Sequence, residues 1–169
     1  YDAFKGKVHL STSIDSPNED WDNLYYIAHL ARTAGLSVET LALEDIGFDE
    51  ENKEFYDMEN ETIHNIFKLH PWEYITSEVP QYDVALQGRI NLFEPAWKML
   101  ISNKCYCVEM FKKFGRHPNL LAAFYEGTNI DTSRFVKKPI LGREGANVTI
   151  PKNLSEIQFV EDYHKSGYI

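Results

Sequence analysis

A strand–helix–strand pattern opens the chain and leaves few folds open to it. Residues 7–13 alternate apolar and polar side chains, which is typical of a strand with one buried face. A helix follows, in which Ser16 is expected to be the cap, Pro17 suits the first position and Glu19 completes a capping box. Residues 36–43 predict a second strand. Two strands joined by a helix favour a parallel sheet, so the sequence predicts an α/β fold.

In the rest of the chain the predicted helices and strands follow one another less regularly. Residues 45–61 are acidic and rich in turn-forming side chains. Beyond them, apolar spacing predicts helices at 71–79, 96–101 and 104–114, and strands at 62–69, 120–125, 135–140 and 148–151.

Charge divides the chain into two parts. The formal net charge is −9, but residues 1–95 carry 19 acidic and 6 basic side chains, whereas residues 96–169 carry 7 acidic and 11 basic ones. Acidic loops that keep the first part soluble explain its charge, but they do not explain the basic second part, which suits an anionic ligand. We expect two lobes with these bounds. The overall excess of acid argues against nucleic acid as a partner.

Nothing in the sequence indicates a membrane partner or export. No apolar run approaches the ~18 residues of a membrane span, and the first residues lack the basic and apolar regions of a secretory signal. Cys105 and Cys107 are too few for a disulfide framework, and no pair of histidines is spaced to complete a metal site with them. We expect a cytoplasmic protein with no metal ligands of its own in this chain.

The loop at 142–147 is the sharpest candidate site. Gly142 and Gly145 permit backbone conformations that turn N–H groups toward a bound anion, and Arg143 adds a forked donor. The loop is not a P-loop, because no Gly-Lys-Ser/Thr follows, and it lacks the three-glycine spacing of a dinucleotide site. The alternative interpretation is an ordinary hairpin turn.

Two lysines strengthen the hypothesis of an anion site. Lys137 and Lys138 are adjacent, so on a strand one of them faces inward or toward a cleft, where a lysine is costly unless an anion meets it. Lys104 lies at a break between two predicted helices and can reach the same cleft from a separate segment. Two lysines under a glycine-containing lid would form a triphosphate clamp. The alternative is an edge strand with both of its lysines exposed.

Five motifs give the chain a resemblance to a known family. In the same order and over nearly the whole chain, they resemble the glutathionylspermidine synthase-like ligases, including uncharacterised bacterial homologues. The motifs lie at 67–73, 93–98, 101–104, 117–121 and 138–148.

The resemblance implies an enzyme that joins a carboxylate to an amine with ATP and Mg²⁺, through an acyl phosphate. It implies a Rossmann-like pre-ATP-grasp lobe at 1–95 and the N-terminal part of an ATP-grasp lobe at 96–169. By motif, Lys104 and Lys138 match the family's nucleotide lysines. The phosphate-covering loop is matched by Glu144 and Gly145, with Gly142, Arg143, Ala146 and Asn147 in the same motif.

The substrate positions depart from the family pattern. Two threonines that contact glutathione in other members are Leu69 and Tyr74 here, and neither offers a compact hydroxyl. The acidic pair at the start of the first helix is retained as Glu19 and Asp20, which the resemblance implicates in substrate binding. Favourable interaction with the helix dipole is the alternative role of this pair. The partners expected are a peptide-like acid, rather than glutathione, and an amine.

The remaining family motifs are not found in residues 1–169. The resemblance implies that magnesium ligands precede Tyr1, and that the adenine hinge and a catalytic arginine follow Ile169. We therefore expect an internal piece of a longer ligase, inactive by itself. Two alternatives stay open: a non-catalytic nucleotide- or peptide-binding module, and a structural fragment that associates through an exposed sheet edge. The sequence does not give the oligomeric state.

Overall fold

The computed structural model describes residues 6–78 and 89–151. The chain divides into two compact units, Tyr1–Ala96 and Trp97–Ile169, and each is described here by itself. Charge predicts a boundary after residue 95. That the second unit is part of an ATP-grasp lobe stays a prediction.

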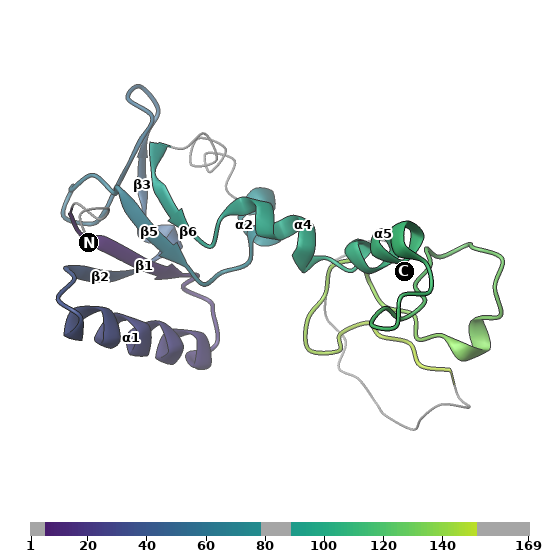
Figure 1. The fold of residues 1–169 in the computed structure, drawn as a ribbon. Helices are drawn as coiled ribbons and strands as arrows, with labels where there is room; N and C mark the ends of the chain where they lie inside the picture. Colours follow the sequence, from purple (N-terminus) through teal and green to yellow (C-terminus); the bar gives the residue numbers. More distant parts are fainter. Residues whose placement is uncertain (1–5, 79–88, 152–169) are drawn as a thin grey trace. The chain divides into compact units, whose positions relative to one another are not determined.

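A parallel sheet is the centre of the first unit (Figure 1), and this confirms the predicted α/β fold. The four strands lie in the order β2-β1-β5-β6, and each neighbouring pair is parallel. The strands of this sheet and the helices that alternate with them are β1 Val8–Thr12, α1 Asn18–Thr33, β2 Val38–Ala42, β5 Asn65–Lys68, α2 Trp72–Glu78 and β6 Asn91–Phe93.

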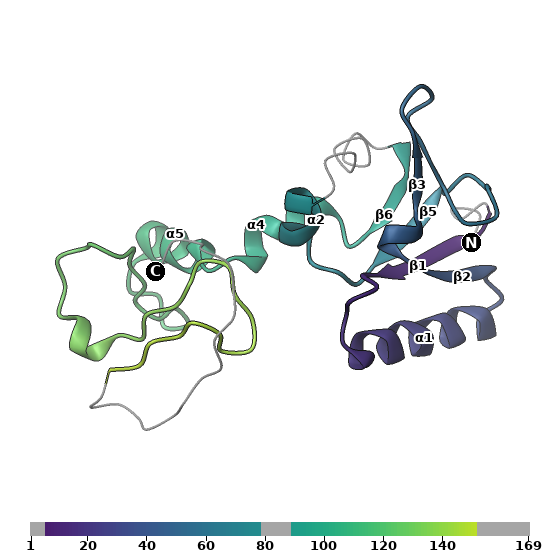
Figure 2. The same cartoon turned by 180° about the vertical axis from the view of Figure 1, so that it is seen from behind.

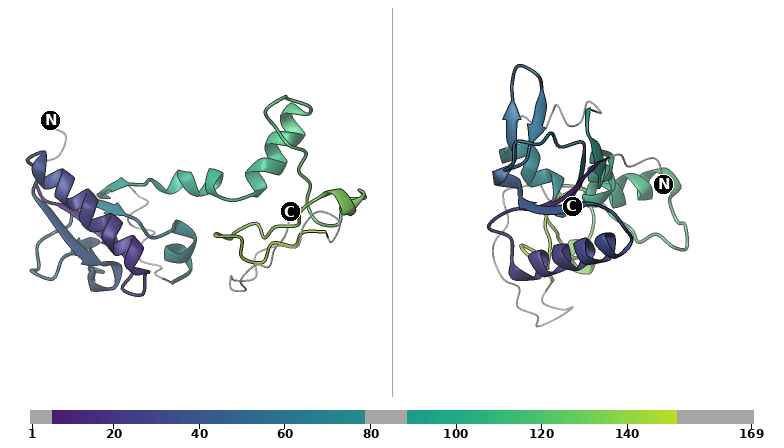
Figure 3. Two further views of the ribbon diagram at one scale, coloured as in Figure 1. Left: turned by 90° about the horizontal axis from the view of Figure 1, so that it is seen from below. Right: turned by 90° about the vertical axis from the view of Figure 1, so that its left-hand side faces the viewer.

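Helix α1 covers one face of the sheet (Figure 3, left). Leu24 and Ala28, four residues apart and therefore on one side of the helix, pack against Val8 and Leu10 of β1. All four side chains are buried, and this contact forms the apolar core of the unit. The predicted strand–helix–strand unit is thus confirmed.

Strand β1 is buried on both faces, not on one face as the alternating pattern predicts. His9 and Ser11, on the face opposite to α1, are 1% and 0% exposed, and Thr12 is 0% exposed. Polar side chains can lie inside a sheet when other segments cover them, and here the chain between β2 and β5 supplies a partner for His9.

The acidic segment forms a hairpin that composition did not predict (Figure 2). Strands β3 Gly47–Asp49 and β4 Glu54–Tyr56 pair antiparallel. Asp49 stabilises the turn, because its carboxylate accepts hydrogen bonds from the backbone of Glu51 and the side chain of Asn52. The acidic side chains of this segment therefore organise backbone as well as supply charge.

The start of α1 corrects the predicted capping box. The helix begins at Asn18 with Pro17 as its N-cap, and no side chain caps it. The Ser16 hydroxyl instead lies 2.8 Å from the hydroxyl of Thr12, at the end of β1. Ser16 thus stabilises the connection between β1 and α1 rather than the N-terminus of α1.

The second unit contains short helices and irregular chain. Its elements are η3 Ala96–Lys98, which begins at the boundary, α4 Met99–Ser102, α5 Cys105–Phe114 and η4 Thr132–Arg134. Within residues 97–151, the strands predicted at 120–125, 135–140 and 148–151 do not form. Isolated bridge positions occur at Lys137 and Pro139, and the first pairs antiparallel with Thr149. Apolar alternation predicts strands poorly where no partner strand lies alongside. No helix in the described ranges is long and apolar enough to cross a bilayer.

Candidate functional site

The predicted anion loop is held closed at its base. Lys137 and Thr149 exchange two backbone hydrogen bonds, with N···O distances of 2.9 and 2.8 Å. The backbone N–H of Lys104, at the start of α5, donates to the carbonyl of Ile140 at 3.0 Å. Hydrogen bonds therefore hold both ends of the segment between Ile140 and Val148, and its first end lies beside the start of α5.

Inside the loop the backbone follows a turn that few residues adopt. Glu144, Gly145 and Asn147 have φ angles of 53°, 80° and 54°. Glu144 and Gly145 are consecutive in this left-handed region. The N–H groups of Ala146 and Val148 donate to the loop's own carbonyls, those of Arg143 and Gly145, at 3.0 and 3.3 Å. Gly145 has the positive φ that a glycine permits, while the prediction that the loop turns N–H groups toward an anion stays a prediction.

Gly142 is required for a different reason. A Cβ atom at this position would lie 2.8 Å from Cγ of Pro139, closer than real contacts allow. Its backbone does not need the left-handed region; it needs the absence of a side chain next to the proline ring.

Most of the predicted nucleotide residues surround one pocket of about 390 Å³. That volume lies in the range of small-molecule sites. The lining residues are Lys104, Val136, Lys138, Gly142, Arg143, Glu144, Gly145, Ala146, Val148 and Ile150. Asn147 belongs to the loop but does not line the pocket.

The two adjacent lysines point to different surroundings. The ammonium of Lys137 pairs with Glu126, outside the pocket. Lys138 lines the pocket and has no hydrogen-bond or ion-pair partner among the described residues. It is exposed and faces the pocket, so of the two surroundings predicted for one of the pair, inward or toward a cleft, the structure shows the second. An exposed ammonium is little desolvated, so Lys138 does not need an anion to be stable.

Lys104 has a defined contact in the same pocket. Its Nζ donates a hydrogen bond to the carbonyl oxygen of Gly142 at 2.8 Å, and its side chain is half-buried. Of the pocket's charged side chains, three are cations and one, Glu144, is a carboxylate. The pocket therefore favours an anionic ligand, while Val136, Val148 and Ile150 offer an apolar wall.

The predicted substrate residues lie in the first unit and line no part of this pocket. Glu19 and Asp20 occupy the first turn of α1, where Glu19 is exposed and Asp20 half-buried. Their position fits interaction with the helix dipole, the alternative role the sequence leaves open. Among the described residues of the first unit, the geometry assigns Glu19 and Asp20 no ligand.

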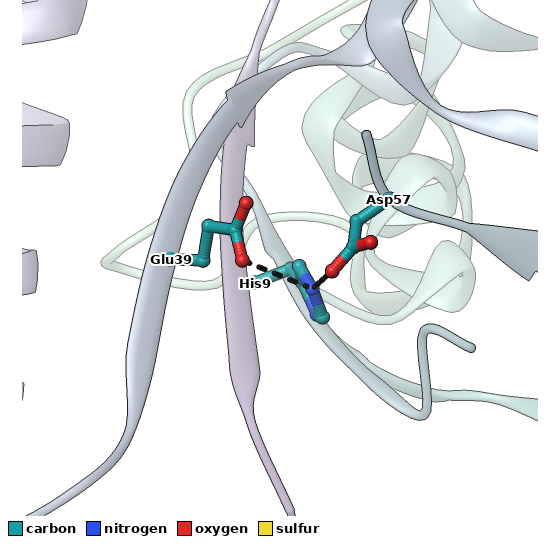
Figure 4. A group of neighbouring side chains, drawn as sticks. All are labelled: His9, Glu39 and Asp57. Carbon is teal, nitrogen blue, oxygen red and sulfur yellow. Dashed lines mark hydrogen bonds and ion pairs between the residues drawn. The ribbon is translucent and has the colours of Figure 1, made fainter. Parts of the chain in front are cut away.

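A second polar cluster, which sequence reasoning missed, joins the sheet to the acidic segment (Figure 4). Nε2 of His9 lies 3.1 Å from a carboxylate oxygen of Asp57 and 4.0 Å from one of Glu39. Burial raises the pKa of Asp57, but hydrogen bonds from the backbone of Glu61 and from the side chains of His9 and Lys7 outweigh it. Together they lower that pKa to about 2.

Lys7 is the counter-ion of this cluster. Its Nζ lies 2.6 Å from Glu39, 2.8 Å from Glu61 and 3.3 Å from Asp57. Hydrogen bonds to Glu39 and Glu61 raise the pKa of Lys7 well above its ordinary value.

In the described ranges, His9, Glu39 and Asp57 are the residues whose ligand atoms are close enough together for a metal ion. The Lys7 ammonium already forms ion pairs with both carboxylates, so we interpret the cluster as an ion-pair network. The sequence signal is Lys7 and His9 on one face of a strand, but their partners come from elsewhere in the chain.

Comparisons with known proteins agree with the resemblance. The sequence model of the family described as glutathionylspermidine synthase preATP-grasp matches residues 1–169. A protein of Haemophilus influenzae named "Putative acid--amine ligase" is 38% identical over 175 residues, which cover 98% of this chain and 44% of that protein. Trypanothione synthetase of Crithidia fasciculata is 28% identical over 178 residues, which cover 90% of this chain and 26% of that protein. The chain spans less than half the length of either relative.

These findings and the fold lead to one assignment. The family match covers the whole chain, and the parallel α/β sheet of the first unit is the architecture expected of such a lobe. The chain belongs to the glutathionylspermidine synthase pre-ATP-grasp family.

Proposed function

We propose that the protein to which this chain belongs is an ATP-dependent carboxylate–amine ligase. The observation that carries the proposal is the convergence of Lys104, Lys138 and the loop of residues 142–147 on one pocket. Family membership and a relative named as an acid–amine ligase support the same class of reaction.

In this proposal the pocket binds the triphosphate. ATP supplies the phosphoryl group that converts a carboxylate into an acyl phosphate, and an amine then displaces phosphate to form the amide. Lys138 and Arg143 neutralise phosphate charge, and the loop covers the reacting group and keeps water from it. A Mg²⁺ ion would share the phosphate charge. The pocket's one carboxylate, on Glu144, does not make a magnesium site alone, so we expect the ion's ligands outside residues 1–169.

The acid substrate is proposed to be peptide-like but not glutathione. Leu69 packs against the core beneath α1, and the Tyr74 ring lies 5.3 Å from that of His70. Leu69 and Tyr74 thus pack against neighbouring side chains, at positions where the glutathione-using members of the family have threonines. Glu19 and Asp20 would bind a cationic group of the acid. The cytoplasm is the proposed compartment, since Cys105 and Cys107 are unbridged thiols.

The test compares two neighbouring lysines in the full-length protein. ADP release is measured across a panel of short peptides, each paired with polyamines and other amines. We expect Lys138→Met to lower ADP release at least tenfold, because a phosphate contact is lost. Lys137→Met is the matched control, since its ammonium pairs with Glu126 outside the pocket. Equal rates in both variants would contradict the proposal. ATP binding without ADP release on any pair would favour a non-catalytic binding module.

A further inference from the structure

We infer that Lys104 is a positioning residue that fixes the start of the 142–147 loop, while Lys138 and Arg143 meet the phosphate charge. Only the part of the inference that concerns phosphate, the roles of Lys138 and Arg143, rests on the proposed function. The positioning role concerns the chain alone and can be tested without nucleotide.

Lys104 makes two bonds to the segment that enters the loop. Its backbone N–H donates to the carbonyl of Ile140 at 3.0 Å, and its ammonium donates to the carbonyl of Gly142 at 2.8 Å. Because Lys104 immediately precedes α5, which begins at Cys105, both bonds tie the loop to a helix. An ammonium–carbonyl bond is charge-assisted and stronger than a neutral one.

Gly142 fits this contact closely. A Cβ atom there would lie 2.8 Å from Pro139 and 3.7 Å from Nζ of Lys104. The glycine therefore sits between the proline ring and the lysine, and its carbonyl is held where the ammonium can reach it. An ammonium has three donors, and the bond to Gly142 uses one of those of Lys104.

Lys138 lines the same pocket as Lys104 but differs from it in two respects. It is exposed, and it holds no other described residue. Its charge is available to a ligand and has no part in the shape of the loop. The two lysines thus predict different effects when each is neutralised.

Amide hydrogen exchange in the full-length protein separates the roles. Without nucleotide, we expect Lys104→Met to raise exchange across residues 142–148 about tenfold, as loss of one charge-assisted bond would. Lys138→Met should leave that exchange unchanged. Lys104→Arg should restore most of the protection, because it keeps a cationic donor. Methionine keeps the length of the stem but not the donor, so a role in packing alone would leave Lys104→Met protected.

Exchange in α5 serves as the internal reference. Loss of protection in the loop but not around Val108, which is buried in α5, supports the inference. Unchanged loop exchange in Lys104→Met, an equal rise in Lys138→Met, or loss of α5 protection in both Lys104 variants would overturn it.

A second arm adds a non-hydrolysable ATP analogue. If the analogue slows amide exchange in residues 142–148 of the wild type but not of Lys138→Met, the result supports the proposed phosphate site. No added protection would count against the proposed function and would leave the nucleotide-free result as it stands.

Discussion

At the scale of single residues, Asp57 combines burial with four accepted hydrogen bonds. One carboxylate oxygen accepts from the backbone of Glu59 and Glu61, and the other from Lys7 and His9. The residue therefore closes its own turn and attaches that turn to the sheet. Burial without these partners would leave a costly charge, so the partners decide its protonation.

This carboxylate makes the first prediction, which concerns acid stability. The pKa of Asp57 is lowered from 3.8 to about 2 in the folded protein. Its contribution is therefore complete above about pH 4 and is lost as the pH falls toward 2. Asp57→Asn should lower the free energy of unfolding at pH 7 by about 2–4 kcal/mol, with the difference from wild type shrinking below pH 4. Guanidinium unfolding at several pH values measures both effects. A difference independent of pH would contradict the assignment.

Gly142 gives the second prediction at this scale. Gly142→Ala should weaken binding of an ATP analogue to the full-length protein by about tenfold, because the new methyl group meets Pro139 and shifts the loop. Gly127→Ala is a suitable control, since its Cβ would meet nothing within 4 Å although its φ of +87° carries backbone strain. Calorimetric titration measures the affinities. Equal affinity in the two variants would show that the close approach to Pro139 is unimportant.

At the scale of elements, helix α1 is attached through one apolar stripe. Leu24 is 0% exposed against β1, whereas the adjacent Tyr25 is 53% exposed. Leu24→Ala should destabilise the first unit by about 3 kcal/mol through the cavity it leaves. Tyr25→Ala should cost less than about 1 kcal/mol. Unfolding midpoints monitored by tryptophan fluorescence compare the two. A similar loss in both would place the core elsewhere.

The sequence predicts a helix or strand best when its formation depends on residues that are close together in the chain. The unit β1–α1–β2 follows from periodicity within about 35 residues, and it forms as expected. The β3–β4 hairpin was missed because Asp49 acts through turn hydrogen bonds that composition does not show. The strand predicted at 135–140 reduces to isolated bridge positions at Lys137 and Pro139, the first of which pairs with Thr149.

At the scale of the whole molecule, the pocket is part of a site that we expect to extend beyond this chain. The chain covers 44% and 26% of the two relatives named above. We therefore expect residues 1–169 alone to bind a non-hydrolysable ATP analogue with a Kd near ~1 mM, about −4 kcal/mol. They should release no ADP with any acid–amine pair. Calorimetry and an ADP assay check both points. Micromolar affinity would mean that the described pocket holds most of the nucleotide contacts.

The sequence alone determined the parallel α/β character of the first unit, the basic charge of the second and the loop at 142–147 as a candidate site. Periodicity, composition and glycine spacing depend on residues that are close together in the chain, so they can be read from the sequence alone. Only the tertiary structure decided that Lys104 holds Gly142 while Lys138 stays exposed, since both lysines carry the same charge and differ in what the fold brings to them. The meeting of His9 with Asp57, 48 residues apart, likewise required the chain to fold back on its sheet.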